Sequence, residues 1–172
     1  MSETVDSTRP RQASVSMREL ARRGYYIGTW VMLAVIVGQF AAAGAGLFSV
    51  LARDPQGATG VTILLYHAGV GPVFVALISV VMVVLAFVGR LPWRMTGMAA
   101  AFFPLLILQS LFIIPYRYPN DIPVLGHMPW LSALHVLNAL FIFWLTIQWP
   151  AWTRQLSDPG RVHSARTGSP LT

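Results

Sequence analysis

Two histidines, His67 and His135, are the residues of this sequence best suited to chemistry. Each lies near the start of a long apolar stretch: His67 in LLYHAGVGPVFVALISVVMVVLAFVG and His135 in WLSALHVLNALFIFWLTIQW. An ionisable side chain inside such a stretch is costly, so both positions are candidate functional sites. A neutral imidazole can ligate a metal through one ring nitrogen while the other nitrogen donates a hydrogen bond to an orienting acceptor.

A glutamine precedes each histidine at nearly the same interval. Gln39 precedes His67 by 28 residues, and Gln109 precedes His135 by 26. This interval places the glutamine late in one helix and the histidine early in the next, so we expect two helical hairpins of one pattern. Asn138 follows His135 by about one helical turn and shares its face. The five side chains are predicted to form one polar layer.

The composition is that of a membrane protein. The chain has 172 residues, of which 55% are apolar and only 10% are charged, and it contains no cysteine. Soluble domains carry about a quarter charged residues. The absence of cysteine excludes disulfides, thiolate metal sites and iron–sulfur clusters. The net charge of +6 comes from twelve arginines without any lysine, which favours a bacterial source with high-GC coding. These arginines lie in tails and loops and do not indicate nucleic-acid binding.

Four apolar stretches are each long enough to cross a bilayer, which takes about 20 residues. We predict spans at about 25–51, 61–89, 95–114 and 131–149. The predicted fold class is therefore an all-α membrane protein, an up-down-up-down four-helix bundle over residues 25–152. A disordered arm over 1–24, becoming helical near Met17, and a disordered tail over 153–172 are expected to flank it.

The arginines predict the orientation of the bundle. Five lie in the N-terminal arm, two in the second loop and three in the C-terminal tail, but only one in each of the other loops. The positive-inside rule then places both termini in the cytoplasm of an inner-membrane protein. Spans two and four enter from the outside and are diagonal neighbours, so their histidines lie near the outer face and can meet across the core. Tyr25, Trp93 and Trp130 are expected to belong to the interfacial aromatic belts.

Gly38, Ala42 and Gly46 place small side chains on one face of the first span. Small residues let helices approach closely in lipid. We expect this face to pack within the bundle rather than form the seam of a homodimer. Besides the lipid bilayer, a membrane-protein partner or a second copy of the chain stays open as a partner.

Both histidines could be axial ligands of a b-type haem, because imidazole is a standard ligand of haem iron. The neighbouring amides or a backbone carbonyl could orient the rings, and two loop arginines could meet the propionates. Gly69 and Gly71 leave space for a flat ligand beside the first histidine. The candidate cofactor site comprises His67, His135, Gln39, Gln109, Asn138, Arg53 and Arg117, with the two histidines as metal ligands.

Two other interpretations of the polar layer stay open. The side chains could hydrogen-bond one another and fix the register of the bundle, or they could line a quinone or small-molecule pocket without a metal. A nucleophile–base–orienter set or a carboxylate pair does not occur within any span, which argues against hydrolytic catalysis. The preferred function is non-catalytic haem binding for electron transfer. The alternative is a cofactor-free structural or partner-binding membrane subunit.

Residues 25–152 resemble a family of small four-span bacterial membrane proteins designated a domain of unknown function. The resemblance lies in Gln39 within VGQFAAAGAGLF, His67 within YHAGVG, and LHVLNALFIF around His135. It implies a fold and a membrane location. More distantly, the layout is similar to one four-helix half of haem A synthase and to bundle cytochromes b, in which histidines on the second and fourth helices bind haem. The chain lacks the glutamate that accompanies the first histidine in haem A synthase, so the resemblance does not extend to synthase activity.

Overall fold

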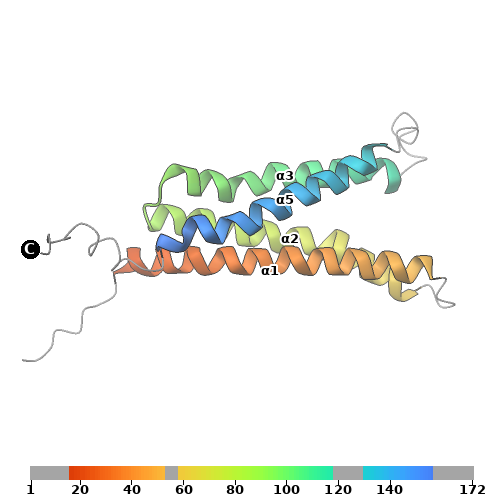
Figure 1. Cartoon of the computed structure of the whole chain (residues 1–172), viewed down its shortest axis with the longest axis horizontal. Helices are drawn as coiled ribbons and strands as arrows, with labels where there is room; N and C mark the ends of the chain where they lie inside the picture. Colours follow the sequence, from red (N-terminus) through yellow and green to blue (C-terminus); the bar gives the residue numbers. More distant parts are fainter. Residues whose placement is uncertain (1–15, 53–57, 118–129, 157–172) are drawn as a thin grey trace, which may run out of the picture.

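The computed structural model describes residues 16–52, 58–117 and 130–156, and these residues are helical almost throughout. The elements are α1 (Met17–Leu51), α2 (Ala58–Val88), α3 (Trp93–Arg117), α5 (Trp130–Thr153) and the short 3₁₀ helix η1 (Arg154–Leu156) (Figure 1). The described residues contain no strand. Each of the four long helices is apolar and long enough to cross a membrane. The predicted all-α four-helix bundle is therefore confirmed.

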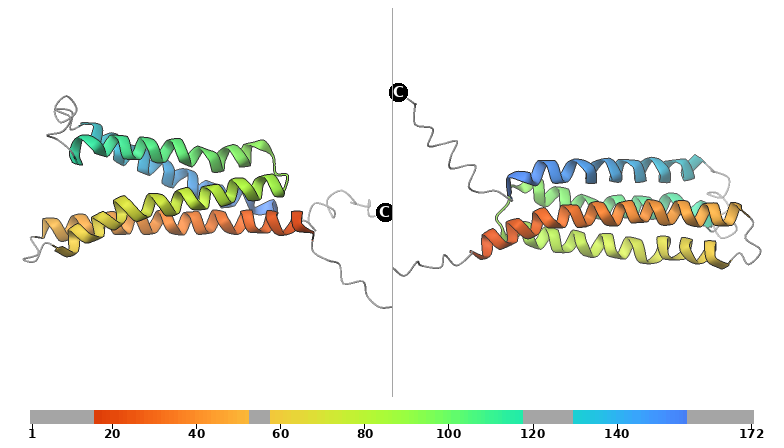
Figure 2. Two further views of the ribbon diagram at one scale, coloured as in Figure 1. Left: turned by 180° about the vertical axis from the view of Figure 1, so that it is seen from behind. Right: turned by 60° about the horizontal axis from the view of Figure 1, so that its bottom comes forward.

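The four long helices pack side by side in the order α1, α2, α3, α5, and α5 closes the ring against α1 (Figures 1 and 2). The α1–α2 pair shares the most extensive contact, whereas α2 and α5 are diagonal, as predicted. The arginine end of the bundle carries Met17, Val88, Trp93 and Thr153, and the histidine end carries Leu51, Ala58, Arg117 and Trp130.

Helix α1 begins at Met17, whereas the predicted span begins at about Tyr25. Ser16 and Glu19 form a capping box at this point. The Ser16 hydroxyl accepts a hydrogen bond from the Glu19 amide at 3.2 Å, and the Glu19 carboxylate accepts one from the Ser16 amide at 3.1 Å. Because these bonds satisfy amides that the first helical turn leaves without partners, they fix the start of the helix. Residues 17–24 of the predicted arm are therefore helical.

Helix α2 ends in a Schellman motif. The Leu91 amide donates to the Ala86 carbonyl at 2.9 Å and the Arg90 amide to the Phe87 carbonyl at 3.1 Å. This pattern needs a residue in the left-handed region, and Arg90 adopts it with a φ of 49°. Glycine usually takes this position because a Cβ is strained there. The chain thus turns from α2 to α3 in a few residues at the cost of one strained arginine.

Two side chains of α1 tie it to this turn. The Arg22 Nε donates to the Gly89 carbonyl at 3.0 Å, and the Tyr25 hydroxyl donates to the Met95 carbonyl at 2.5 Å. The Arg22 guanidinium thereby places positive charge at the C-terminus of α2, where the helix dipole favours it. Tyr25 is fully buried, so its ring packs inside the bundle, and its predicted depth at the interface stays a prediction. Its hydroxyl reaches a backbone carbonyl in the first turn of α3.

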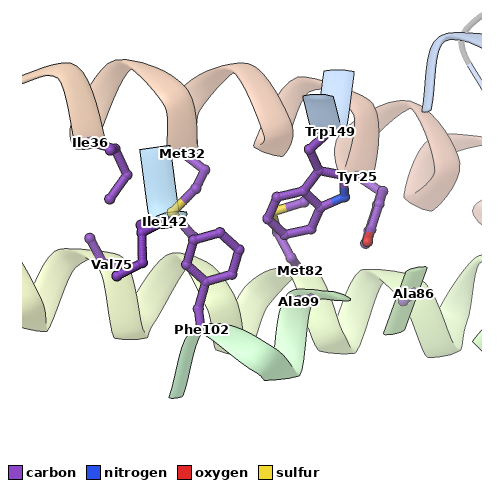
Figure 3. Packing of buried hydrophobic residues seen from close by; sticks show 10 residues of the cluster. All are labelled: Tyr25, Met32, Ile36, Val75, Met82, Ala86, Ala99, Phe102, Ile142 and Trp149. Atoms are coloured by element: carbon purple, nitrogen blue, oxygen red, sulfur yellow. The ribbon is translucent and has the colours of Figure 1, made fainter. Parts of the chain in front are cut away.

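The buried hydrophobic core lies mainly in the half of the bundle toward the arginine end, and all four helices contribute to it (Figure 3). Trp149 of α5 stacks on Phe102 of α3 with ring centroids 5.2 Å apart and an interplanar angle of 13°. Tyr25 meets the edge of the same indole at 6.0 Å and 73°. Aromatic pairs of these two geometries are favourable beyond the area they bury. This cluster holds α1, α3 and α5 together around one indole.

Four buried hydroxyl groups in this half form their hydrogen bonds within their own helices. They belong to Thr29, Ser79, Thr146 and Thr153, and each donates to a carbonyl three or four residues earlier. Such bonds remove the cost of a buried hydroxyl without linking one helix to another. The helices in this half of the bundle are therefore held together mainly by packing of apolar side chains.

The small-residue face of α1 packs only in part. Gly46 is buried, and a Cβ there would lie 2.7 Å from the Leu64 Cγ of α2. Gly38 is exposed and a Cβ there would meet no atom within 4 Å, so the prediction that it packs in the bundle is wrong. Buried positions on α1 advance by three or four residues, as in coiled coils, and this series passes through Gln39 instead of Gly38.

Candidate functional site

Toward the histidine end, His135 of α5 contacts Gln109 of α3 at two atoms. The His135 Nδ1 lies 2.9 Å from the Gln109 backbone oxygen, and its Nε2 lies 3.1 Å from the Gln109 side-chain nitrogen. A carbonyl only accepts and an amide nitrogen only donates. The ring is therefore the neutral tautomer in which Nδ1–H donates to the carbonyl and the Nε2 lone pair accepts from the amide.

Asn138 fixes which way the Gln109 carboxamide points. Its Nδ2 donates to the Gln109 Oε1 at 2.7 Å and to the Leu105 backbone oxygen at 2.9 Å. Because Oε1 accepts from Asn138, the amide nitrogen of Gln109 is left to face His135. The three side chains and two carbonyls form a closed network between α3 and α5, and all of its side chains are partly buried.

The corresponding pair on α1 and α2 is arranged differently. The His67 ring approaches the backbone of Gln39, as the His135 ring approaches Gln109, but its buried Nδ1 has no hydrogen-bond partner. The Gln39 carboxamide lies against Gly71, where a Cβ would collide with it. The space beside Gly71 is thus occupied by the Gln39 side chain and is not open. Space remains only at Gly69, where a Cβ would meet no atom within 4 Å.

His67 and His135 stand on the diagonal helices α2 and α5. Gln39, His67, Gln109, His135 and Asn138 all lie in the half of the bundle toward the histidine end. Two further candidates are not placed: Arg53 lies outside the described residues, and Arg117 is the last residue of α3 with no described side chain.

Sequence analysis missed two features of this site. One is the carbonyl of Leu105, which becomes an acceptor for Asn138 because it lies one helical turn before Gln109 on the same face of α3. The other is the unequal bonding of the two hairpins, in which His135 is fully paired and His67 is not. The sequence signal for the second feature is the residue three positions after each histidine: Asn138 supplies a donor on α5, whereas the equivalent position on α2 is Val70, which has no polar side chain.

The described residues contain no group of three or more histidine, cysteine, aspartate or glutamate side chains that could hold a metal ion. Two imidazoles from opposite helices suit a metal that brings most of its own ligands, as haem iron does. The donor set fits this use at His135, since a ligating histidine normally donates its other N–H to a carbonyl. An iron at Nε2 would replace the Gln109 amide as the partner of that atom.

A scan of family models, a search of curated proteins and a search of solved structures found no match for this chain. The fold defines the class of the protein. Four apolar helices in one antiparallel bundle are the architecture of a multi-pass integral membrane protein. The function is therefore inferred from the polar layer.

Proposed function

We propose that this protein binds a b-type haem between α2 and α5, with His67 and His135 as axial ligands, and transfers electrons. The observation that carries the proposal is the hydrogen bond from the His135 Nδ1 to the Gln109 carbonyl. It leaves Nε2 as the ring atom with the lone pair, which now accepts from the Gln109 amide and which a haem iron would take in place of that amide. When bound, haem supplies one-electron redox chemistry.

The residues around the histidines hold the rings in position. The Gln109 carbonyl accepts a hydrogen bond from the Nδ1–H of His135, which fixes the orientation and tautomer of the ring. Asn138 holds Gln109 in turn. For His67, whose Nδ1 has no hydrogen-bond partner, the proposal requires the ring to turn toward the backbone of Gln39 when a ligand binds.

The proposed location is the bacterial inner membrane, with both termini in the cytoplasm. Six described arginines lie at the arginine end: Arg18, Arg22, Arg23, Arg90, Arg94 and Arg154. At the histidine end the described ranges contain one, Arg117. Because basic residues are retained on the cytoplasmic side, the histidine pair would lie toward the outer face.

Absorption spectroscopy of the full chain, purified after expression with ample haem, tests the proposal. The wild type should show a low-spin Soret band that shifts and sharpens on reduction. His67→Ala and His135→Ala should each abolish the low-spin spectrum, and the double variant should be little worse, since the ligands act as one unit. The control is His127→Ala, a histidine between the third and fourth predicted spans and outside the described residues, which should leave the spectrum unchanged. A wild type without a Soret band, even after haem is added, would overturn the proposal.

A cofactor-free membrane subunit is the second candidate, and one observation favours it. The His135 Nε2 already accepts a hydrogen bond from Gln109, so this side of the layer is satisfied without a metal. On this alternative the layer fixes the packing of α3 on α5 for a structural or partner-binding role. The two histidine variants would then cause small and separate losses of thermal stability in a colourless protein.

A further inference from the structure

A pocket unrelated to the histidines opens at the arginine end between α2 and α3. Its volume is about 460 Å³, and it spans the last turn of α2, the connecting turn and the first two turns of α3. It is lined by Ala86, Phe87, Arg90, Leu91, Trp93, Thr96, Gly97 and Ala100. The pocket thus lies where the membrane-crossing stretches of both helices end, at the level of lipid headgroups.

The walls of the pocket suit a hydrocarbon chain. Phe87 and Trp93 are 69% and 79% exposed, and they stand on the two helices that border it. Gly97 and Ala100 add little bulk between them. Because exposed aromatic rings at this depth contact lipid and not water, an acyl chain can lie between the rings over the small residues.

Two arginines give the same region an uncompensated positive charge. Arg90 lines the pocket, and Arg94 is exposed on the first turn of α3. Within the described ranges, neither guanidinium forms an ion pair or hydrogen bond. The neighbouring Arg22 donates to the Gly89 carbonyl, and the carboxylate of Glu19 accepts from the Ser16 amide. A phosphate group is therefore the natural partner of Arg90.

We propose that this pocket binds one anionic phospholipid, with its phosphate against Arg90 and the start of an acyl chain between Phe87 and Trp93. Basic pockets between helices at the cytoplasmic interface are suited to such headgroups. The left-handed backbone of Arg90 sets the direction of its side chain at the turn. The proposal does not depend on haem binding, since the pocket shares no residue with the polar layer.

Native mass spectrometry of the full chain in detergent tests the proposal, using phosphatidylglycerol and phosphatidylcholine with identical acyl chains. The wild type should retain one phosphatidylglycerol in preference to phosphatidylcholine. Arg90→Asn removes the charge but suits the left-handed backbone, so the variant should fold and lose about five-fold in that preference. Arg90→Lys should keep most of it. Arg23→Gln removes an equal charge from an exposed position on α1 and should leave the preference intact.

A second pair of variants tests the apolar part of the pocket. Gly97→Phe should fill it and lower the retention of both lipids, whereas Gly38→Phe adds the same bulk at an exposed glycine and should not. Equal retention of the two lipids by the wild type, or equal losses in Arg90→Asn and Arg23→Gln, would overturn the proposal. The proposal would also be overturned if the wild type were a dimer and Gly97→Phe converted it to a monomer. A second copy of the chain would then occupy the pocket.

Discussion

The imidazole of His135 is held by a single residue, Gln109, through the backbone oxygen at 2.9 Å and the side-chain nitrogen at 3.1 Å. One residue of α3 therefore determines both the tautomer and the orientation of a ring on α5. Any role of His135, as a ligand or as a packing residue, depends on where Gln109 lies.

Removing the Gln109 side chain should weaken the α3–α5 contact. Gln109→Leu and Asn138→Leu should each lower the free energy of unfolding by about 1 kcal/mol, the usual scale of hydrogen bonds between membrane helices. The double variant should cost less than the sum, because both changes remove the 2.7 Å bond between these residues. Thermal melting in detergent measures this. Ser110→Ala, which affects only a bond within α3, is the control. Strict additivity would contradict the network.

Packing of α1 on α2 should respond to bulk at one glycine and not at another. Gly46→Leu should destabilise the bundle by about 1–3 kcal/mol, because even its Cβ would overlap Leu64. Gly38→Leu adds the same atoms where no neighbour lies and should be nearly neutral. The melting temperatures of the two variants and the wild type in detergent measure the difference. A larger loss at Gly38 would show that α1 is rotated relative to the arrangement described above.

The strained turn after α2 offers a stabilising substitution. Arg90→Gly should raise the free energy of unfolding by about 1 kcal/mol, because glycine adopts a φ of 49° without the Cβ penalty. Arg90→Ala loses the same charge but keeps the Cβ, so it should not stabilise. Melting of both variants in detergent without added phospholipid separates backbone strain from charge. Equal stabilities of the two variants would mean that strain at this turn is negligible.

The orientation can be tested with single cysteines, since the chain has none of its own. Cysteines at Ala58 and Asn120 should react with an impermeant thiol reagent in intact cells, and one at Gly160 should react only after lysis. The arginine distribution is the reason for this expectation. The reverse labelling pattern would place the histidine layer toward the cytoplasm.

Much of the fold follows from local features of the sequence. Each span is an apolar run of sufficient length, and the antiparallel order follows from short connections such as the one around Arg90. The helical start near Met17 was predicted, and Ser16 and Glu19 stand at the spacing of a capping box in SMRE that explains it. The predicted span boundary near Tyr25 followed hydropathy alone, so it lies eight residues inside the helix.

Side-chain positions were harder to predict because they depend on how each helix is rotated against its neighbours. Gly38 and Gly46 look equivalent along the chain, yet only Gly46 meets another helix. The sequence predicts an interfacial Tyr25 but not the bond from its hydroxyl to the Met95 carbonyl of α3. Likewise, the spacing of Gln109 and His135 suggested that they meet, but not that His135 would use both ring nitrogens on one residue.

The extensive contact between α1 and α2 has a consequence for biogenesis. Chains are made from the N-terminus, so this pair can complete its contacts while α3 and α5 are still being synthesised. The α1–α2 hairpin then lies in the bilayer with the Nδ1 of His67 unpaired. When the α3–α5 hairpin enters the bilayer, its polar side chains are already hydrogen-bonded to one another. Assembly is then the docking of two helical hairpins, and the bond from the Tyr25 hydroxyl to the Met95 carbonyl is a polar contact that joins them.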